Sequence, residues 1–178
     1  MRHTGKGGAS WQSVALDDSW LSSGVHDFTF NVDKNVSNWL FIGVATRSWQ
    51  GYTDTVNGYV GHFNDSWGFC SFPGWGCAHA SKQSGLRTAP LLLFFLSSLP
   101  EDDAPQQRRT CHVCGLVGSG VGNSFKTGDV VQMTVDMDAK TVAYAVNGKN
   151  LGVCHKGIVT EVCPAITLYH EGDQVTLA

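Results

Sequence analysis

The sequence has few charged residues, and those that it has leave it slightly acidic. Only 15% of its 178 residues are Asp, Glu, Lys or Arg, and the formal net charge is −3 at pH 7. The only adjacent basic pair is Arg108–Arg109. Because binding to nucleic-acid phosphates or to an acidic membrane surface requires clustered Lys and Arg, this composition argues against both kinds of partner.

Long hydrophobic runs are also lacking. The most apolar run, residues 91–96, is far shorter than the ~20 residues that a membrane-spanning helix needs. Residues 1–16 contain no continuous apolar core, so we expect no secretory signal. Without such a signal, the six cysteines are expected to be reduced thiols, and the protein is expected in the cytoplasm or the nucleus.

Patterns that signal catalysis or metal binding are scarce. The sequence has no GxSxG nucleophile elbow, and its seven histidines are scattered singly. Cys111 and Cys114 form a CxxC pair, but a structural zinc site needs four ligands and no second pair stands at ordinary spacing. Residues 115–127 are rich in glycine, yet Phe125 stands where a phosphate loop requires glycine. We therefore expect no catalytic site, no metal and no cofactor, with a zinc protein or an enzyme as the least favoured alternative.

Glycine and large aromatic residues, in contrast, are abundant. The chain has 21 glycines, nine phenylalanines and six tryptophans, a composition typical of many short strands joined by tight turns. Its length suits a single domain with a sizeable core. Since helical periodicity does not persist along residues 10–84, we predict an all-β fold.

The most regular pattern lies between Gly128 and Gly152. Apolar residues alternate with polar ones along residues 131–135 and again along residues 142–146, which is the period of strands with one buried face. A turn at residues 138–140 separates the two segments. Asn147–Gly148, which tolerates the positive φ of a type I′ turn, ends the second segment. The stretch therefore predicts a β-hairpin.

Shorter strand signals occupy much of the remaining chain. Residues 38–46 are almost continuously apolar, as in a strand that is buried on both faces. Together the signals predict a sandwich of two antiparallel sheets, which buries two apolar sheet faces. Besides the hairpin, strands are expected at residues 11–16, 26–33, 38–46, 67–72, 77–79, 162–169 and 173–177.

The segment from Leu86 to Gly122 interrupts this pattern. It follows neither the helical nor the strand period, and a structureless loop of this length is uncommon within a compact domain. Its residues 91–100 have pyrimidine-rich codons. We interpret it as a disordered surface insertion or as an artefact of the gene model, such as a translated intron. Residues 1–9 are assigned to a flexible N-terminus, and 10–178 to one domain that contains this interruption.

Several segments together resemble, in order, the successive motifs of the SPRY (B30.2/SPRY) domain family. They read WLFIGVAT, HFNDSWGF, GDVVQMTVDMDAKTVAYAVNGKNLGV and CPAITLYHEGDQVTL. The resemblance covers almost the whole chain apart from residues 86–122. It implies a bent, concanavalin-like jelly-roll sandwich of two antiparallel sheets that has no catalytic centre and recognises other proteins. Its most specific parts are residues 66–68, 128–129, 135–138, 147–148 and 151–152.

The resemblance also implies where a partner would bind. Peptide binders of this family use positions near the strand before GVAT, the loop before SWG and the end of the penultimate strand. His170–Glu171 replace a Trp-Gly pair that some of those binders carry, which implies a different peptide ligand. Carried onto this sequence, the positions are Asn38, Val56, Tyr59, Tyr169, His170 and Glu171, with Arg47 and Trp49 in the same loop region.

We therefore expect a non-catalytic adaptor module that recognises a short peptide or a loop of a partner protein through its edge loops. Aromatic residues in loops support this expectation, because such side chains commonly anchor interfaces. The alternative is a lectin-like or small-ligand-binding β-sandwich, since related sandwiches bind sugars against aromatic faces.

Overall fold

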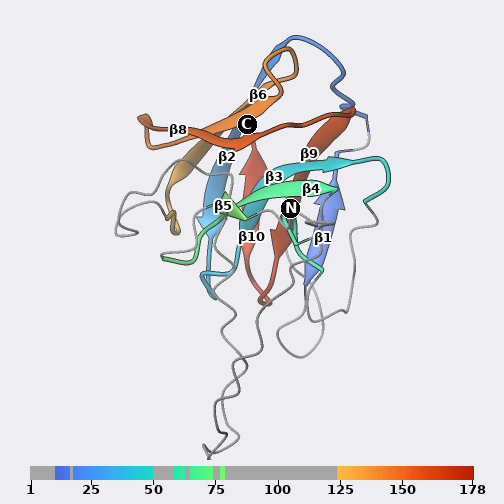
Figure 1. Cartoon of the computed structure of the whole chain (residues 1–178). Coiled ribbons are helices and arrows are strands. Elements are labelled where there is room, and N and C mark those ends of the chain that lie inside the picture. The colour runs from blue at the N-terminus through green and yellow to red at the C-terminus, as the bar shows by residue number, and fades with distance from the viewer. Residues whose placement is uncertain (1–10, 17, 50–57, 63–64, 74–76, 79–123) are drawn as a thin grey trace, which may run out of the picture.

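The computed structural model of the chain describes residues 11–16, 18–49, 58–62, 65–73, 77–78 and 124–178. Within these residues the chain forms ten strands and no helix. This part of the chain therefore has no helix that could cross a membrane. Figure 1 shows the strands as two layers.

Each layer is an antiparallel sheet of five strands. The first, here called the β3 sheet, has the order β1 (Gln12–Ala15), β9 (Val162–Leu168), β3 (Phe41–Thr46), β4 (Ser66–Cys70) and β5 (Cys77–Ala78). The second, the β6 sheet, has the order β10 (Gln174–Leu177), β2 (Val25–Lys34), β6 (Val130–Asp136), β7 (Thr141–Val146) and β8 (Lys149–Lys156). The predicted all-β sandwich is confirmed.

The main hydrophobic core lies between the two sheets. Met133 and Val135 of β6 are fully buried in the same cluster as Ile42 and Val44 of β3. The hydroxyl of Tyr144 on β7 donates to the carbonyl oxygen of Ile42 at 3.1 Å and so joins the sheets through the core. Burial raises the pKa of Tyr144 far above its ordinary value, because the phenolate would lack water. The hydroxyl therefore remains a hydrogen-bond donor.

The β3 strand is buried on both faces, as its continuous apolar sequence predicts. Successive side chains of a strand point to opposite faces, so Phe41 and Ala45 lie on the face opposite to Ile42 and Val44. Phe41 and Ala45 are fully buried in a second hydrophobic cluster, which lies on the outer side of the β3 sheet. This second cluster forms the base of the candidate site.

The hairpin is confirmed, but the strand that follows it was not predicted. Asn147 and Gly148 have φ of 50° and 77°, as a type I′ turn requires. The turn leads into β8, which continues to Lys156. The sequence pattern predicts no strand after this turn before residue 162. The pairing of β7 with β8 shifts register twice. As a result the buried residues of β8 do not follow a period of two, and the strand signal is lost.

The cysteines agree with the sequence expectation only in part. Cys70 is a free thiol and is buried, and Cys163 is buried as well. Cys154 on β8 is disulfide-bonded, so the expectation of reduced thiols is wrong at this position. Cys111 and Cys114 lie outside the described residues, as do the flexible N-terminus and the 86–122 insertion, and those expectations stay predictions.

Candidate functional site

Six aromatic side chains gather on the outer side of the β3 sheet. They come from segments far apart in the sequence: the start of β1, the loop before β3, β3 itself, the segment before β4, the residues after β4 and the end of β9. We call them the aromatic face: Trp11, Trp39, Phe41, Tyr59, Phe72 and Tyr169.

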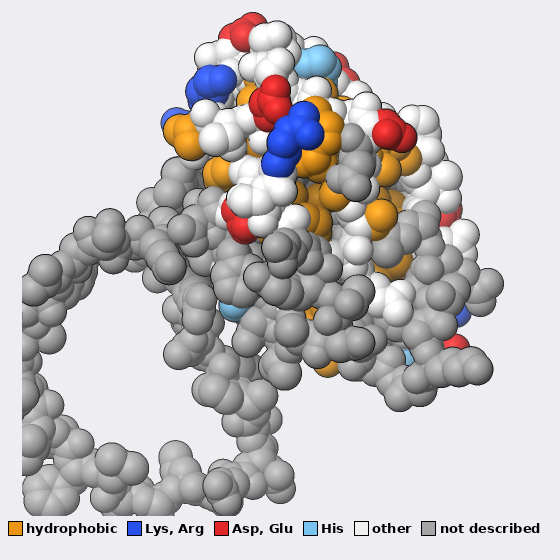
Figure 2. Space-filling view, turned by 90° about the vertical axis from the view of Figure 1, so that its right-hand side faces the viewer, with side chains coloured by type: hydrophobic (Ala, Val, Ile, Leu, Met, Phe, Trp, Pro, Cys, Tyr) orange, Lys and Arg blue, Asp and Glu red, His pale blue; other side chains and the backbone are white. Residues whose placement is uncertain are grey.

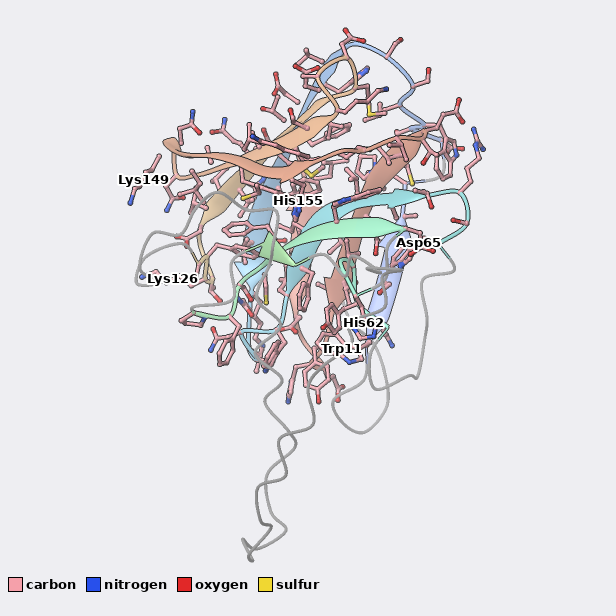
Figure 3. The ribbon with its side chains drawn as sticks, viewed as in Figure 1. Trp11, His62, Asp65, Lys126, Lys149 and His155 are labelled. Atoms are coloured by element: carbon pink, nitrogen blue, oxygen red, sulfur yellow. The ribbon has the colours of Figure 1, made fainter. Side chains whose placement is uncertain are left out.

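Trp11 lies at the centre of the aromatic face. Its ring centroid is 4.4 Å from that of Tyr169, 5.0 Å from that of Tyr59 and 6.4 Å from that of Trp39. At these separations Trp11 is in contact with each of the three rings. Trp11 is only 8% exposed, whereas Tyr59, Tyr169 and Trp39 are half-buried. The aromatic face is thus a packed surface with exposed ring edges and faces. Figure 3 shows Trp11 beside the β3 sheet.

Hydroxyl side chains of β1 and β9 fix the backbone on both sides of Tyr59. The Ser13 hydroxyl donates to the carbonyl oxygen of Gly58 at 3.1 Å, and the N–H of Val60 donates to Thr167 Oγ1 at 3.0 Å. Ser13 Oγ and Thr167 Oγ1 are themselves hydrogen-bonded at 2.7 Å. Tyr59 is therefore held over β9 by its two neighbours in the chain.

Gly68 of β4 allows the same segment to lie directly on the sheet. A Cβ at this position would approach the carbonyl oxygen of Val60 to 2.5 Å, which no real Cβ tolerates. The glycine of the Ser66-Trp67-Gly68 motif is thus required by the close approach of two backbones.

Asp173 joins the loop before β3 to the loop after β9. Its carboxylate is fully buried and accepts hydrogen bonds from the N–H groups of Val36 and His170, at 2.7 and 2.9 Å. Further bonds come from the N–H of Tyr169 and the hydroxyl of Ser37. Asp173 is not among the predicted site residues, although a similar Gly-Asp pair, Gly128–Asp129, is one of the most specific motifs of the family resemblance.

The structure brings together part of the predicted partner-binding set. Tyr59 and Tyr169 both pack against the ring of Trp11. Asn38, with φ of 59°, is exposed next to Trp39, and its N–H donates to Asn35 Oδ1 at 3.0 Å. His170 and Glu171 follow Tyr169, and His170 Nδ1 lies 2.9 Å from the carbonyl oxygen of Glu171. Trp49 is only 8% exposed and belongs to the cluster beneath the aromatic face. Val56 lies outside the described residues.

Arg47 lies apart from this set, at the opposite end of β3 from Asn38. Its guanidinium carbon is 4.2 Å from the centre of the Trp20 ring, and its Nε donates to Glu161 Oε2 at 2.9 Å. An open cleft of about 580 Å³ lies beside it and is also lined by Val159. Figure 2 faces the side of the molecule nearest β1, where hydrophobic side chains are exposed between acidic and basic ones.

Four members of the aromatic face are not among the predicted site residues: Trp11, Trp39, Phe41 and Phe72. All four fall within the strands predicted at residues 11–16, 38–46 and 67–72. The sequence indicates these residues only indirectly. A strand as apolar as residues 38–46 must be buried on both faces, so large apolar side chains from other parts of the chain must pack on its second face.

The described residues show no arrangement typical of a metal centre. No group of three or more His, Cys, Asp or Glu side chains in this part of the chain is placed to hold an ion.

The comparison with protein families decides the assignment. The model of the SPRY domain matches residues 25–178. The chain belongs to the SPRY domain family. The expectation from the sequence motifs is confirmed, and SPRY domains generally act as protein-interaction modules.

Solved structures support the same fold. The crystal structure of the SPRY domain of human HERC1 is 17% identical, with 98% of this chain and 84% of that chain covered and a TM-score of 0.58. A second human SPRY domain is 13% identical, with 99% and 88% covered and a TM-score of 0.59. At such identities the likeness concerns the fold alone. No curated protein is similar enough to count as a match.

Proposed function

We propose that this SPRY domain is a non-catalytic module that binds a short segment or a loop of a partner protein across its aromatic face. The observation that carries the proposal is the packing of half-buried Tyr59 and Tyr169 against Trp11, from two separate loops. Cytoplasm or nucleus remains our proposal for where this binding takes place.

Mutual packing makes these rings suitable anchors. A ring that is already held by its neighbours loses little conformational freedom when a partner covers it, so more of the contact free energy remains for binding. Tyrosine also offers a hydroxyl at the edge of its ring and is enriched at the energetic centres of interfaces.

The shape of the aromatic face favours an extended ligand. Because Tyr59, Tyr169 and Trp39 all pack against Trp11, we expect a ligand to lie across these rings. The surrounding polar residues, Asn38, His170 and Glu171, lie in loops beside the rings. An apolar centre with a polar rim is the usual composition of a protein–protein contact surface.

Peptide selection tests this proposal. Peptides selected from a random library on the full chain are expected to lose at least about tenfold in affinity with Tyr59→Ala or Tyr169→Ala, because truncation of an interface anchor costs about 2 kcal/mol. Fluorescence anisotropy gives the affinities. Val25→Ala is the control, because Val25 is 59% exposed on the β6 sheet. Peptide binding that neither tyrosine affects would refute the proposed surface, and binding of glycans without any peptide would favour the lectin-like alternative.

A further inference from the structure

We propose that Asp173 is the positioning residue of the aromatic face. Its carboxylate fixes the loop before β3 and the loop after β9 as one unit, so that Trp39 and Tyr169 are held on either side of Trp11. This inference rests on the proposed function, and it adds how the recognition surface is preformed.

The hydrogen bonds of Asp173 reach both loops. Oδ1 accepts the N–H of Val36 at 2.7 Å, and Oδ2 accepts the hydroxyl of Ser37 at 3.2 Å, both from the loop before β3. Oδ2 also accepts the N–H groups of His170 at 2.9 Å and Tyr169 at 3.3 Å, from the loop after β9. Oδ2 therefore accepts three of these four bonds and Oδ1 accepts one.

Ser37 extends this connection to Trp39. Its hydroxyl oxygen accepts the N–H of Trp39 at 3.1 Å while its own proton goes to Asp173. A continuous path of hydrogen bonds therefore joins the backbone of Trp39, through Ser37 and Asp173, to the backbone of Tyr169. The rings of these two residues are the ones that contact Trp11 from the two loops.

Asp173 is itself firmly placed. Its side chain is fully buried, and its N–H donates to the carbonyl oxygen of His170 at 3.0 Å. Gly172, with φ of 93°, makes the turn that brings the carboxylate back toward both loops. A buried carboxylate needs hydrogen-bond donors from the protein, and the two loops supply them.

Replacement of Asp173 by asparagine has a selective effect on the loops. The amide keeps one oxygen and turns the other into an NH₂ donor, which cannot accept a hydrogen bond. If the NH₂ takes the place of Oδ2, the N–H groups of Tyr169 and His170 lose their acceptor, and so does the hydroxyl of Ser37. If it takes the place of Oδ1, Val36 loses its acceptor. In either orientation one loop is released.

Asp129 provides a matched control, because it follows Gly128 as Asp173 follows Gly172 and likewise precedes a strand. Its carboxylate accepts the N–H of Lys126 at 2.8 Å and the Nδ2 of Asn147 at 2.9 Å. These contacts hold the start of β6 and the turn before β8, and neither residue belongs to the aromatic face. Asp129→Asn therefore disturbs an equivalent group elsewhere in the sandwich.

Hydrogen exchange on the full chain tests the positioning without any ligand. In Asp173→Asn, the amides of Val36 or those of Tyr169 and His170 are expected to exchange at least about tenfold faster than in the wild type, because their opening free energy falls. In Asp129→Asn the same amides are expected to exchange as in the wild type. Unchanged exchange in both loops of Asp173→Asn would overturn the proposal.

Binding of a fluorescent peptide, selected on the wild type and dependent on Tyr169, tests the consequence for recognition. We expect about tenfold weaker binding for Asp173→Asn, about threefold for Ser37→Ala and less than about twofold for Asp129→Asn. Faster loop exchange with unchanged affinity would refute the positioning role and leave the proposed function intact. If no selected peptide depends on Tyr59 or Tyr169, the proposed function fails and the positioning role falls with it. If Asp173→Asn does not fold, the hydrogen exchange and the peptide affinity of Ser37→Ala test the positioning role instead.

Discussion

Burial determines the chemistry of Cys70, which lies in the cluster beneath the aromatic face. Its side chain is fully buried and its thiol is free. Desolvation raises the pKa of this thiol far above its ordinary value, against a smaller lowering by a hydrogen bond from the Phe72 N–H. The thiol is therefore protonated and unreactive in the folded protein.

This raised pKa makes stability depend on pH. The unfolded thiol ionises above about pH 8.5, whereas the folded one does not, so the stabilising contribution is complete below that pH and is lost as pH rises. Above that pH, the free energy of unfolding of the wild type is expected to fall by up to about 1.4 kcal/mol per pH unit. Cys70→Ala is expected to remove this decline. Urea unfolding at several pH values above about 8.5 measures it, and an identical slope in wild type and variant would contradict the assignment.

Single residues also show where prediction from sequence stops. Tyr59 and Tyr169 were predicted through the family motifs, because they lie beside segments that the motifs identify. Asp173 was not, because its role depends on a contact with Val36 across 137 positions of the chain. Nothing in the local sequence distinguishes a buried carboxylate between two loops from an aspartate in an exposed turn.

At the scale of elements, periodicity and turn chemistry predicted most strands. β6, β7 and the Asn147–Gly148 turn follow from alternation and from residues that tolerate positive φ. β3 follows from a continuous apolar run. β8 was missed because two register shifts break its alternation, and such shifts depend on the partner strand rather than on the sequence of β8 itself.

The contact between β4 and the segment before it leads to a prediction. Gly68→Ala places a Cβ against the Val60 carbonyl, so residues 58–62 must move away from the sheet. We expect a loss of about 1–3 kcal/mol in the free energy of unfolding and weaker peptide binding, because Tyr59 moves with the segment. Thermal unfolding and anisotropy measure the two effects.

Gly148→Ala is the comparison for this variant. It strains a turn of the β6 sheet, where an added Cβ meets no atom within 4 Å. It is expected to lower stability without a change in peptide affinity. Unaltered peptide binding by Gly68→Ala would show that the segment does not depend on this glycine.

At the scale of the whole molecule, the β3 sheet separates two apolar layers with different roles. The layer between the sheets holds the sandwich together, whereas the outer layer ends in partly exposed rings. A change in one layer should therefore affect stability and recognition in different proportions.

Two truncations test this division. Met133→Ala, in the layer between the sheets, is expected to cost about 2–5 kcal/mol of unfolding free energy and to leave peptide affinity within about twofold under folding conditions. Trp11→Ala should cost a similar amount but weaken binding by at least about tenfold, because Tyr59 and Tyr169 lose their shared support. Equal losses of affinity in the two variants would contradict the separation of roles.

The register shifts of β8 have a consequence for how this molecule meets other copies of itself. Among the described strands β8 is an edge of its sheet, and lysines stand at both its ends. Irregular pairing and positive charge both disfavour addition of a further strand to such an edge. The longest edge strand in the described part of the chain is thus protected against the strand-to-strand assembly that leads to aggregation.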